Sequence, residues 1–189
     1  MAHYSDDEVF PVRRITAGAL GDAGRRVFVL QVQVSGQTYS WLIAKEQALA
    51  LSRMLPTLLS DVRAAFPELD EPLVASEPDM ALAEPVWPQF RVGSIGVGYD
   101  RIHDLVVLIL ADTAREEAEG EELLGSPQAP TKAHVYTTRG QALLLSHQAE
   151  TVVAAGRPFC PNCGEPVDEF GHFCLSEAVR RRRGGAYVQ

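Results

Sequence analysis

Gln47-Ala-Leu-Ala-Leu-Ser-Arg-Met-Leu-Pro-Thr-Leu-Leu59 returns later in the chain as Gln141-Ala-Leu-Leu-Leu-Ser-His-Gln-Ala-Glu-Thr-Val-Val153, with six of thirteen positions identical. Leucine and alanine recur in both copies with the spacing of an amphipathic helix, which accounts for part of the identity. The strand-like segments before each copy repeat as well. We therefore interpret the chain as an internal duplication, the alternative being two similar amphipathic helices by coincidence.

Three strand-like segments precede each of these helices. They are residues 14–20, 26–34 and 38–43 before the first helix, and 90–99, 105–110 and 133–137 before the second. Short turns join several of them, which favours antiparallel hairpins. Neither half has helices for both faces of a sheet, so a Rossmann-like parallel fold is not expected. The sequence predicts an α+β fold of antiparallel sheet, in which two strand-strand-strand-helix repeats are related by a pseudo-two-fold axis.

The second helix has the clearer boundaries. Thr138 and Gln141 form a capping box, with the threonine at the N-cap and the glutamine at N3, and Gly156 is placed to end the helix. The first helix contains Pro56, which we expect to kink or interrupt it. Its apolar face is expected to include Met54.

These patterns divide the chain into four parts. We expect a first βββα half at residues 12–65, a Pro-rich acidic crossover at 66–89, a second βββα half at 90–156 and a zinc-binding tail at 157–189. The crossover is expected to hold a short helix near Asp79–Ala83. A mobile, acidic loop at 113–131 is expected to interrupt the second half.

Charge is distributed unevenly over the 189 residues. The net charge is −8, and the tail with its five arginines and four acids is close to +1, so the body is close to −9. Such a body is a poor match for nucleic acid. Only Arg180-Arg-Arg-Arg183 offers a basic run.

The remaining composition bears on localisation. No apolar stretch is long enough to cross a bilayer, and the acidic N-terminus lacks the basic and apolar regions of a signal peptide. Three cysteines in one cluster fit a reducing compartment. We expect a cytoplasmic protein without membrane contact.

All three cysteines fall in the motif Cys160-x2-Cys163-x8-His172-x-Cys174. Thiolates and imidazole are the ligands that tetrahedral zinc prefers in structural sites. A C-x2-C turn followed by glycine resembles a zinc knuckle. A full set of four ligands leaves no position for a reacting water, which favours a structural zinc ion over a catalytic one. Three reduced cysteines and a surface histidine are the alternative.

A wider resemblance adds to this motif. The run from Val152 to Cys174, with Phe90-Arg-Val-Gly-Ser94 and the helix that starts at Gln141, resembles an actinobacterial conserved hypothetical family, domain of unknown function 3090. The resemblance spans most of residues 12–174. It implies the same four ligands and a bacterial source, and it implies no catalytic activity. The chain departs from the family pattern at Leu175, where members commonly carry proline.

Other residues with chemical potential are less specific. His103 lies between Asp100 and Asp104 in a predicted turn and could form an acid/base cluster, although turns collect aspartate for backbone reasons. His134 shares a strand face with Tyr136 and could line a groove. The glycines of residues 93–98 lie in a strand and not before a helix, so they favour strand packing or a bulge over phosphate binding.

Two bulky residues complete the set of expectations. Trp41 and Trp87 have large apolar side chains, and we interpret both as core residues in preference to ligand-binding surfaces.

Three functional hypotheses follow. The first is a non-enzymatic zinc-binding adaptor or regulator with a protein partner. The second is an enzyme with a site in the groove between the repeats, using His103, Asp104 or His134. The third is nucleic-acid binding through the zinc tail and Arg180–Arg183, which would weaken steeply with salt. The sequence leaves the oligomeric state open.

Overall fold

Six strands and two helices make up the described part of the fold in this computed structural model. The structure describes residues 11–22, 25–76, 79–112, 132–155, 160, 162–163 and 174. The elements run β1 (Arg14–Leu20), β2 (Val27–Val34), β3 (Gln37–Ile43), α1 (Lys45–Ala65), β4 (Pro88–Asp100), β5 (Leu105–Asp112), β6 (Lys132–Thr138) and α3 (Arg139–Ala154). The predicted α+β class is confirmed, and both halves follow the order strand, strand, strand, helix.

The six strands form one sheet in chain order. Within each half the neighbours pair antiparallel, as the short turns predicted. The seam between the halves is different, because β3 and β4 run parallel. Parallel neighbours need a long crossover, and residues 66–87 supply it between α1 and β4.

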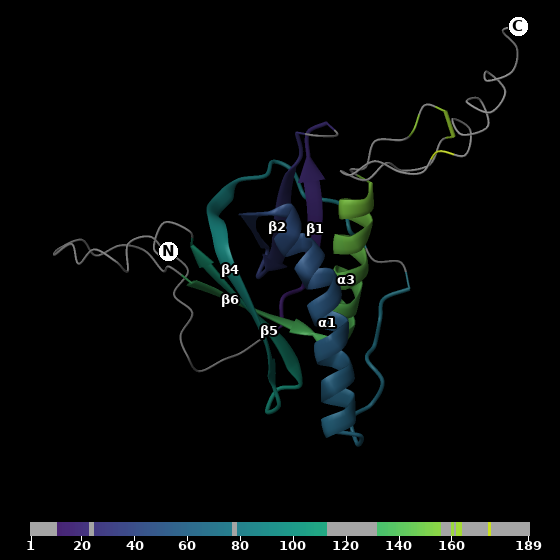
Figure 1. Ribbon diagram of the computed structural model, residues 1–189. Coiled ribbons are helices and arrows are strands. Elements are labelled where there is room, and N and C mark those ends of the chain that lie inside the picture. The colour runs from purple at the N-terminus through teal and green to yellow at the C-terminus, as the bar shows by residue number, and fades with distance from the viewer. Residues whose placement is uncertain are drawn as a thin grey trace, which may run out of the picture.

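The start of β1 also touches the last strand of the sheet. The N–H of Val12 donates to the backbone oxygen of Tyr136 in β6 at 2.8 Å. The residues just before β1 are therefore joined to the last strand of the sheet at this point. The sheet is bent so far that the helices fit inside its curve (Figure 1).

One face of the sheet and the two helices form the core. α1 and α3 lie side by side against this face (Figure 1). Leu30, Trp41 and Leu108 come from the sheet, and Leu51 and Leu145 come from the helices. Their alternation with polar or exposed neighbours along each strand and helix explains why these segments fold as amphipathic elements.

The opposite face of the first half is covered by the crossover. Thr16 Oγ1 donates to the backbone oxygen of Met80 at 2.7 Å, and Gln31 exchanges two hydrogen bonds with the backbone of Ala83, at 3.0 and 2.7 Å. Segment 79–83 is thereby fixed on β1 and β2 by polar groups that would otherwise be buried without partners.

Segment 79–83 is the first of several corrections to the sequence analysis. It contains no helix, contrary to prediction, because its backbone groups bond to side chains of the sheet. Pro56 does not interrupt α1, which is continuous from Lys45 to Ala65. Packing of the apolar stripe against the sheet and α3 compensates for the missing amide donor.

Two apolar residues lie in other surroundings than expected. Trp41 is buried, as predicted, but Trp87 is 77% exposed because it precedes β4 outside the sheet. Met54 is exposed on α1. Gly156 and the acidic loop 113–131 lie outside the described residues. Among the helices that the structure does describe, none has the length and apolar character to span a membrane.

Candidate metal centre

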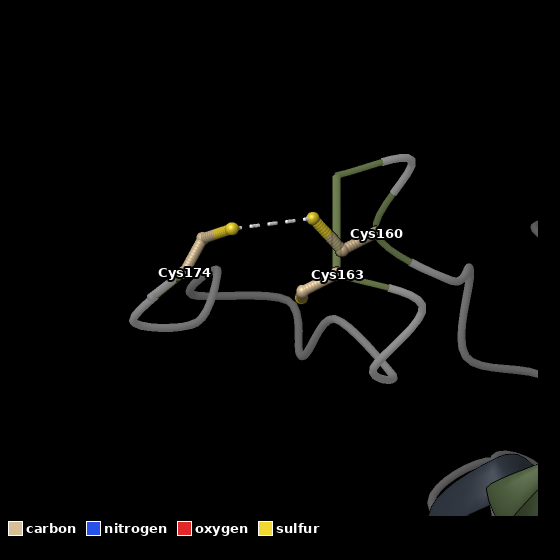
Figure 2. Close-up of side chains that lie close together, drawn as sticks. All are labelled: Cys160, Cys163 and Cys174. Carbon is tan, nitrogen blue, oxygen red and sulfur yellow. Dashed lines mark hydrogen bonds between the residues drawn. The ribbon is translucent and has the colours of Figure 1, made fainter. Parts of the chain in front are cut away.

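The three cysteines come together although up to fourteen positions separate them in the chain. Their sulfur atoms all lie within 4.8 Å of one another, and Cys160 Sγ is 3.8 Å from Cys174 Sγ (Figure 2). Cys160 and Cys174 are buried, and Cys163 is partly exposed. None of the three forms a disulfide. The structure therefore brings together three of the four predicted ligands.

The C-x2-C turn favours the thiolate form of its first cysteine. The backbone N–H of Asn162 donates to Cys160 Sγ at 3.4 Å. This hydrogen bond lowers the pKa of the Cys160 thiol, opposed by desolvation and helped by a second backbone bond from Cys163. Amide donors of this kind stabilise a negatively charged sulfur, which is the form that binds a metal.

The three thiols and their spacing fit a divalent metal ion that prefers thiolate ligands. Two sulfurs bound at about 2.3 Å to one tetrahedral zinc ion lie about 3.8 Å apart. The Cys160–Cys174 distance of 3.8 Å agrees with this value, and all three sulfurs lie within 4.8 Å of one another. The three cysteines could thus hold a metal ion. His172, the predicted fourth ligand, lies outside the described residues, as does the run Arg180–Arg183.

The turn between β4 and β5 holds the residues that suggested acid/base chemistry. His103 Nδ1 lies 2.6 Å from Asp100 Oδ2, and the Asp100 carboxylate also accepts the N–H groups of Ile102 and His103. The hydrogen bond with His103 lowers the pKa of Asp100, with the backbone bonds adding to it. Asp100 therefore acts as an aspartate turn residue whose side chain caps the backbone that follows.

Asp104 is engaged in a different set of contacts. Arg139 binds it through two nitrogens, with Nε 2.7 Å from Oδ1, and Tyr99 donates its hydroxyl to Oδ1 at 2.7 Å. Desolvation opposes ionisation of the carboxyl, but the bonds from Arg139 and Tyr99 outweigh it and lower the pKa of Asp104. Burial, together with the bond to Asp104, raises the pKa of Tyr99 to about 12. These groups fix the turn to the start of α3.

His134 does not join this cluster. It lies on β6 opposite Ile109, whereas Leu105, the neighbour of Asp104, pairs with Thr138 at the other end of the strand. Four residues of strand, about 13 Å, separate the two positions. The structure therefore does not bring His103, Asp104 and His134 together around one groove.

Sequence reasoning missed two sets of residues. The sequence does not identify Arg139, because its position one residue after the N-cap carries no signal for a partner thirty-five residues away. The sequence predicts a capping role for Gln141 only, and Gln47 carries no such signal because Ala44 precedes its helix. In the structure Gln47 Nε2 also donates to the backbone oxygens of Val92 and Gly93, and Gln141 Nε2 donates to those of Val12 and Arg13.

Comparison with known proteins identifies a family for the chain. No curated protein and no solved structure matches it significantly. The profile of one family, described as a protein of unknown function (DUF3090), matches residues 8–174, which include the sheet, both helices and all three cysteines. The chain therefore belongs to the DUF3090 family.

Proposed function

We propose that this protein binds one zinc ion in its C-terminal tail through Cys160, Cys163, His172 and Cys174, and that the metal-bound tail recruits a protein partner. The convergence of three thiols at zinc-like spacing is the observation that carries the proposal. His172 supplies the fourth ligand because it stands two residues before Cys174 and completes a C-x2-C-x8-H-x-C motif.

The ion in this proposal is structural. Three thiolates and an imidazole fill a tetrahedral shell, so the site has no open position for a substrate or a reacting water. A tail of some thirty residues is also too short to bury a core of its own. Metal binding would then provide the free energy that orders the tail.

Elemental analysis of the purified protein tests the metal directly. We expect one zinc ion per chain, lost on changing any one of the three cysteines to serine. His172→Ala should lose the ion or bind it more weakly. His147→Ala, at an exposed position on α3, is the matched control and should keep full occupancy. Zinc-free wild-type protein would contradict the proposal.

The adaptor role needs a separate measurement, because a metal site alone does not imply a partner. Proteins recovered with the wild-type chain from its native host should be lost with Cys160→Ser and kept with His147→Ala. If the wild type and Cys160→Ser recovered the same partners, the adaptor role would be contradicted and the zinc site would not.

We further propose that the two halves of the scaffold are copies related by a pseudo-two-fold axis. The two N3 glutamines support this, because each caps its own helix and also bonds to the backbone of the other half, Gln47 within β4 and Gln141 just before β1. Gln47 binds Val92 and Gly93, and Gln141 binds Val12 and Arg13, which occupy matching positions. Matching registers add to the support, with the rows Ala17, Leu30, Trp41 and Val97, Leu108, Val135.

A further inference from the structure

The two halves can be compared position by position on the face of the sheet that points away from the helices. Strand register defines matching rows. The row Thr16, Gln31, Ser40 in the first half corresponds to Gly96, Ile109, His134 in the second, and the row Gly18, Val29, Leu42 corresponds to Gly98, Val107, Tyr136. We call these residues the first outer face and the second outer face.

The first outer face is occupied by a peptide segment of the chain itself. Thr16, Gln31 and Ser40 are each at most 2% exposed, since segment 79–83 lies over them. The side chain of Leu82 sits directly on Gly18, where an added Cβ would be 2.5 Å from Leu82 Cγ. Gly18 thus leaves the space that the side chain of Leu82 occupies, and we call such a position a leucine seat.

The same segment is held at its beginning by charge. Arg14 Nε donates to the backbone oxygen of Asp79 at 2.6 Å, and its guanidinium lies 3.5 Å from the Asp79 carboxylate. The occupant of the first outer face therefore has an acidic residue three positions before a leucine.

The second outer face has a glycine at the position that matches Gly18, but no segment among the described residues covers it. At Gly98, which matches Gly18, an added Cβ would meet no described atom within 4 Å beyond its own chain neighbours. Ile109 is 37% exposed at the position of the buried Gln31, and Gly96 and His134 are exposed as well. Ile109, the half-buried Val107 and the two glycines give the centre of this face an apolar character.

A basic group also lies at the matching end of the second outer face. The row Ser94, Ala111, Lys132 corresponds to Arg14, Gln33, Thr38, so the cation has moved from the first strand to the third but keeps its row. Lys132 is exposed in a body whose net charge is close to −9. This row complements an acidic side chain in the way that Arg14 complements Asp79.

We infer that the second outer face is a docking site for an extended segment of a partner protein, with an acidic residue near Lys132 and a leucine seated on Gly98. The inference is independent of metal at the tail. Ile109 in place of Gln31 makes this site more apolar than its internal counterpart, and His134 provides a hydrogen-bonding group for the backbone of the segment.

A synthetic peptide with the sequence of residues 77–85, Glu-Pro-Asp-Met-Ala-Leu-Ala-Glu-Pro, is the probe, because it contains segment 79–83, which binds the first outer face. Titration of the full-length protein by calorimetry should give saturable binding. Gly98→Leu fills the seat and should weaken binding by about tenfold or more. Lys132→Glu should also weaken it, and Lys45→Glu, at an exposed site on α1, should not.

Changing the leucine of the peptide to alanine gives a test that does not depend on the folding of a protein variant, and it should weaken binding as well. Absence of binding, or equal binding to Gly98→Leu, overturns the inference. Binding that appears only after deletion of residues 114–130 would assign the face to this chain's own loop. Self-association that Gly98→Leu abolishes would assign it to a second copy, and either result overturns the partner proposal.

Discussion

At the scale of single residues, Asp104 carries three side-chain hydrogen bonds on the turn between β4 and β5. Its backbone φ is +53°, a conformation that non-glycine residues rarely adopt. The two bonds from Arg139 and the bond from Tyr99 hold the side chain in this position. The aromatic ring of Phe66, 6.0 Å from that of Tyr99, packs beside it and joins the end of α1 to the same turn.

Removing the arginine should therefore be costly for a charged group near the surface. Arg139→Met is expected to lower the free energy of unfolding by about 1–2 kcal/mol, because the partly exposed Asp104 loses two charge-assisted hydrogen bonds. Chemical denaturation measures this. Arg63→Met is the matched control, since the Arg63–Glu71 pair is exposed on both sides and should cost at most about 0.5 kcal/mol. Equal effects of the two variants would contradict the structural role of Asp104.

The depressed pKa of Asp104 gives a pH dependence of definite sign. Because the folded pKa lies below the unfolded value of about 3.9, the stabilisation is complete above that pH and is lost as the pH falls through the folded pKa. The difference in unfolding free energy between wild type and Asp104→Asn should be constant near neutral pH and shrink below about pH 4. If the difference in unfolding free energy grew on acidification, the pKa of Asp104 would be raised in the folded protein and not lowered. Asp61→Asn, at an exposed position on α1, is the control.

At the scale of the element, the two helices have different starts but the same connection. Thr138 caps α3 with its hydroxyl, whereas Ala44 cannot, and Gln47 instead accepts the N–H of Ala44 at 2.7 Å. Both glutamines also donate to backbone oxygens of the other half, Gln47 to residues of β4 and Gln141 to residues just before β1. The capping box at Thr138 was predictable because it is local in sequence. The bond to the opposite half was not, because it depends on how the halves are placed.

If the halves are equivalent copies, their glutamines should contribute alike. Gln47→Ala and Gln141→Ala are each expected to lower the free energy of unfolding by about 1–3 kcal/mol, since each leaves backbone oxygens without a donor. Thermal or chemical unfolding measures the two costs. Gln89→Ala, on an exposed side chain, should have little effect. A large cost for only one of the two glutamines would count against the pseudo-two-fold.

At the scale of the whole molecule, the crossover ties the halves together at more than one point. On its way to segment 79–83 it passes the first turn of α3, where a Cβ added at Gly140 would be 1.8 Å from the backbone oxygen of Leu73. The glycine therefore lies in the path of the chain, which explains a residue that is otherwise unfavourable inside a helix.

Gly140→Ala should consequently act against helix propensity. In an exposed helix this change stabilises by about 1 kcal/mol, but here the backbone must move, so we expect a loss of at least about 2 kcal/mol. Gly98→Ala is the control, because its Cβ would meet nothing within 4 Å. Differential scanning calorimetry of the two variants decides the matter. A stabilised Gly140→Ala would mean that the crossover does not pass α3 in solution.

Metal removal should affect the tail and leave the body intact. The main core cluster draws on the strands, the helices and Val12 and includes none of the three cysteines. A chelator should shift the melting temperature of the body by less than about 2 °C. It should at the same time speed tryptic cleavage at Arg157, measured by mass spectrometry, because the metal orders the tail. Unchanged cleavage would remove the proposed structural role of the metal.

The sequence by itself determined what is local. The strands, both helices, the capping box at Thr138 and the grouping of three cysteines follow from alternation, helical spacing and ligand spacing, and the structure agrees with each. Only the tertiary structure decided what depends on residues far apart in the chain. The parallel seam between β3 and β4, the bond from Val12 to Tyr136, the exposure of Trp87 and the extended segment on the first outer face are of this kind. Their energies come from partners in other elements, and no pattern along a single stretch of sequence specifies which partners will meet.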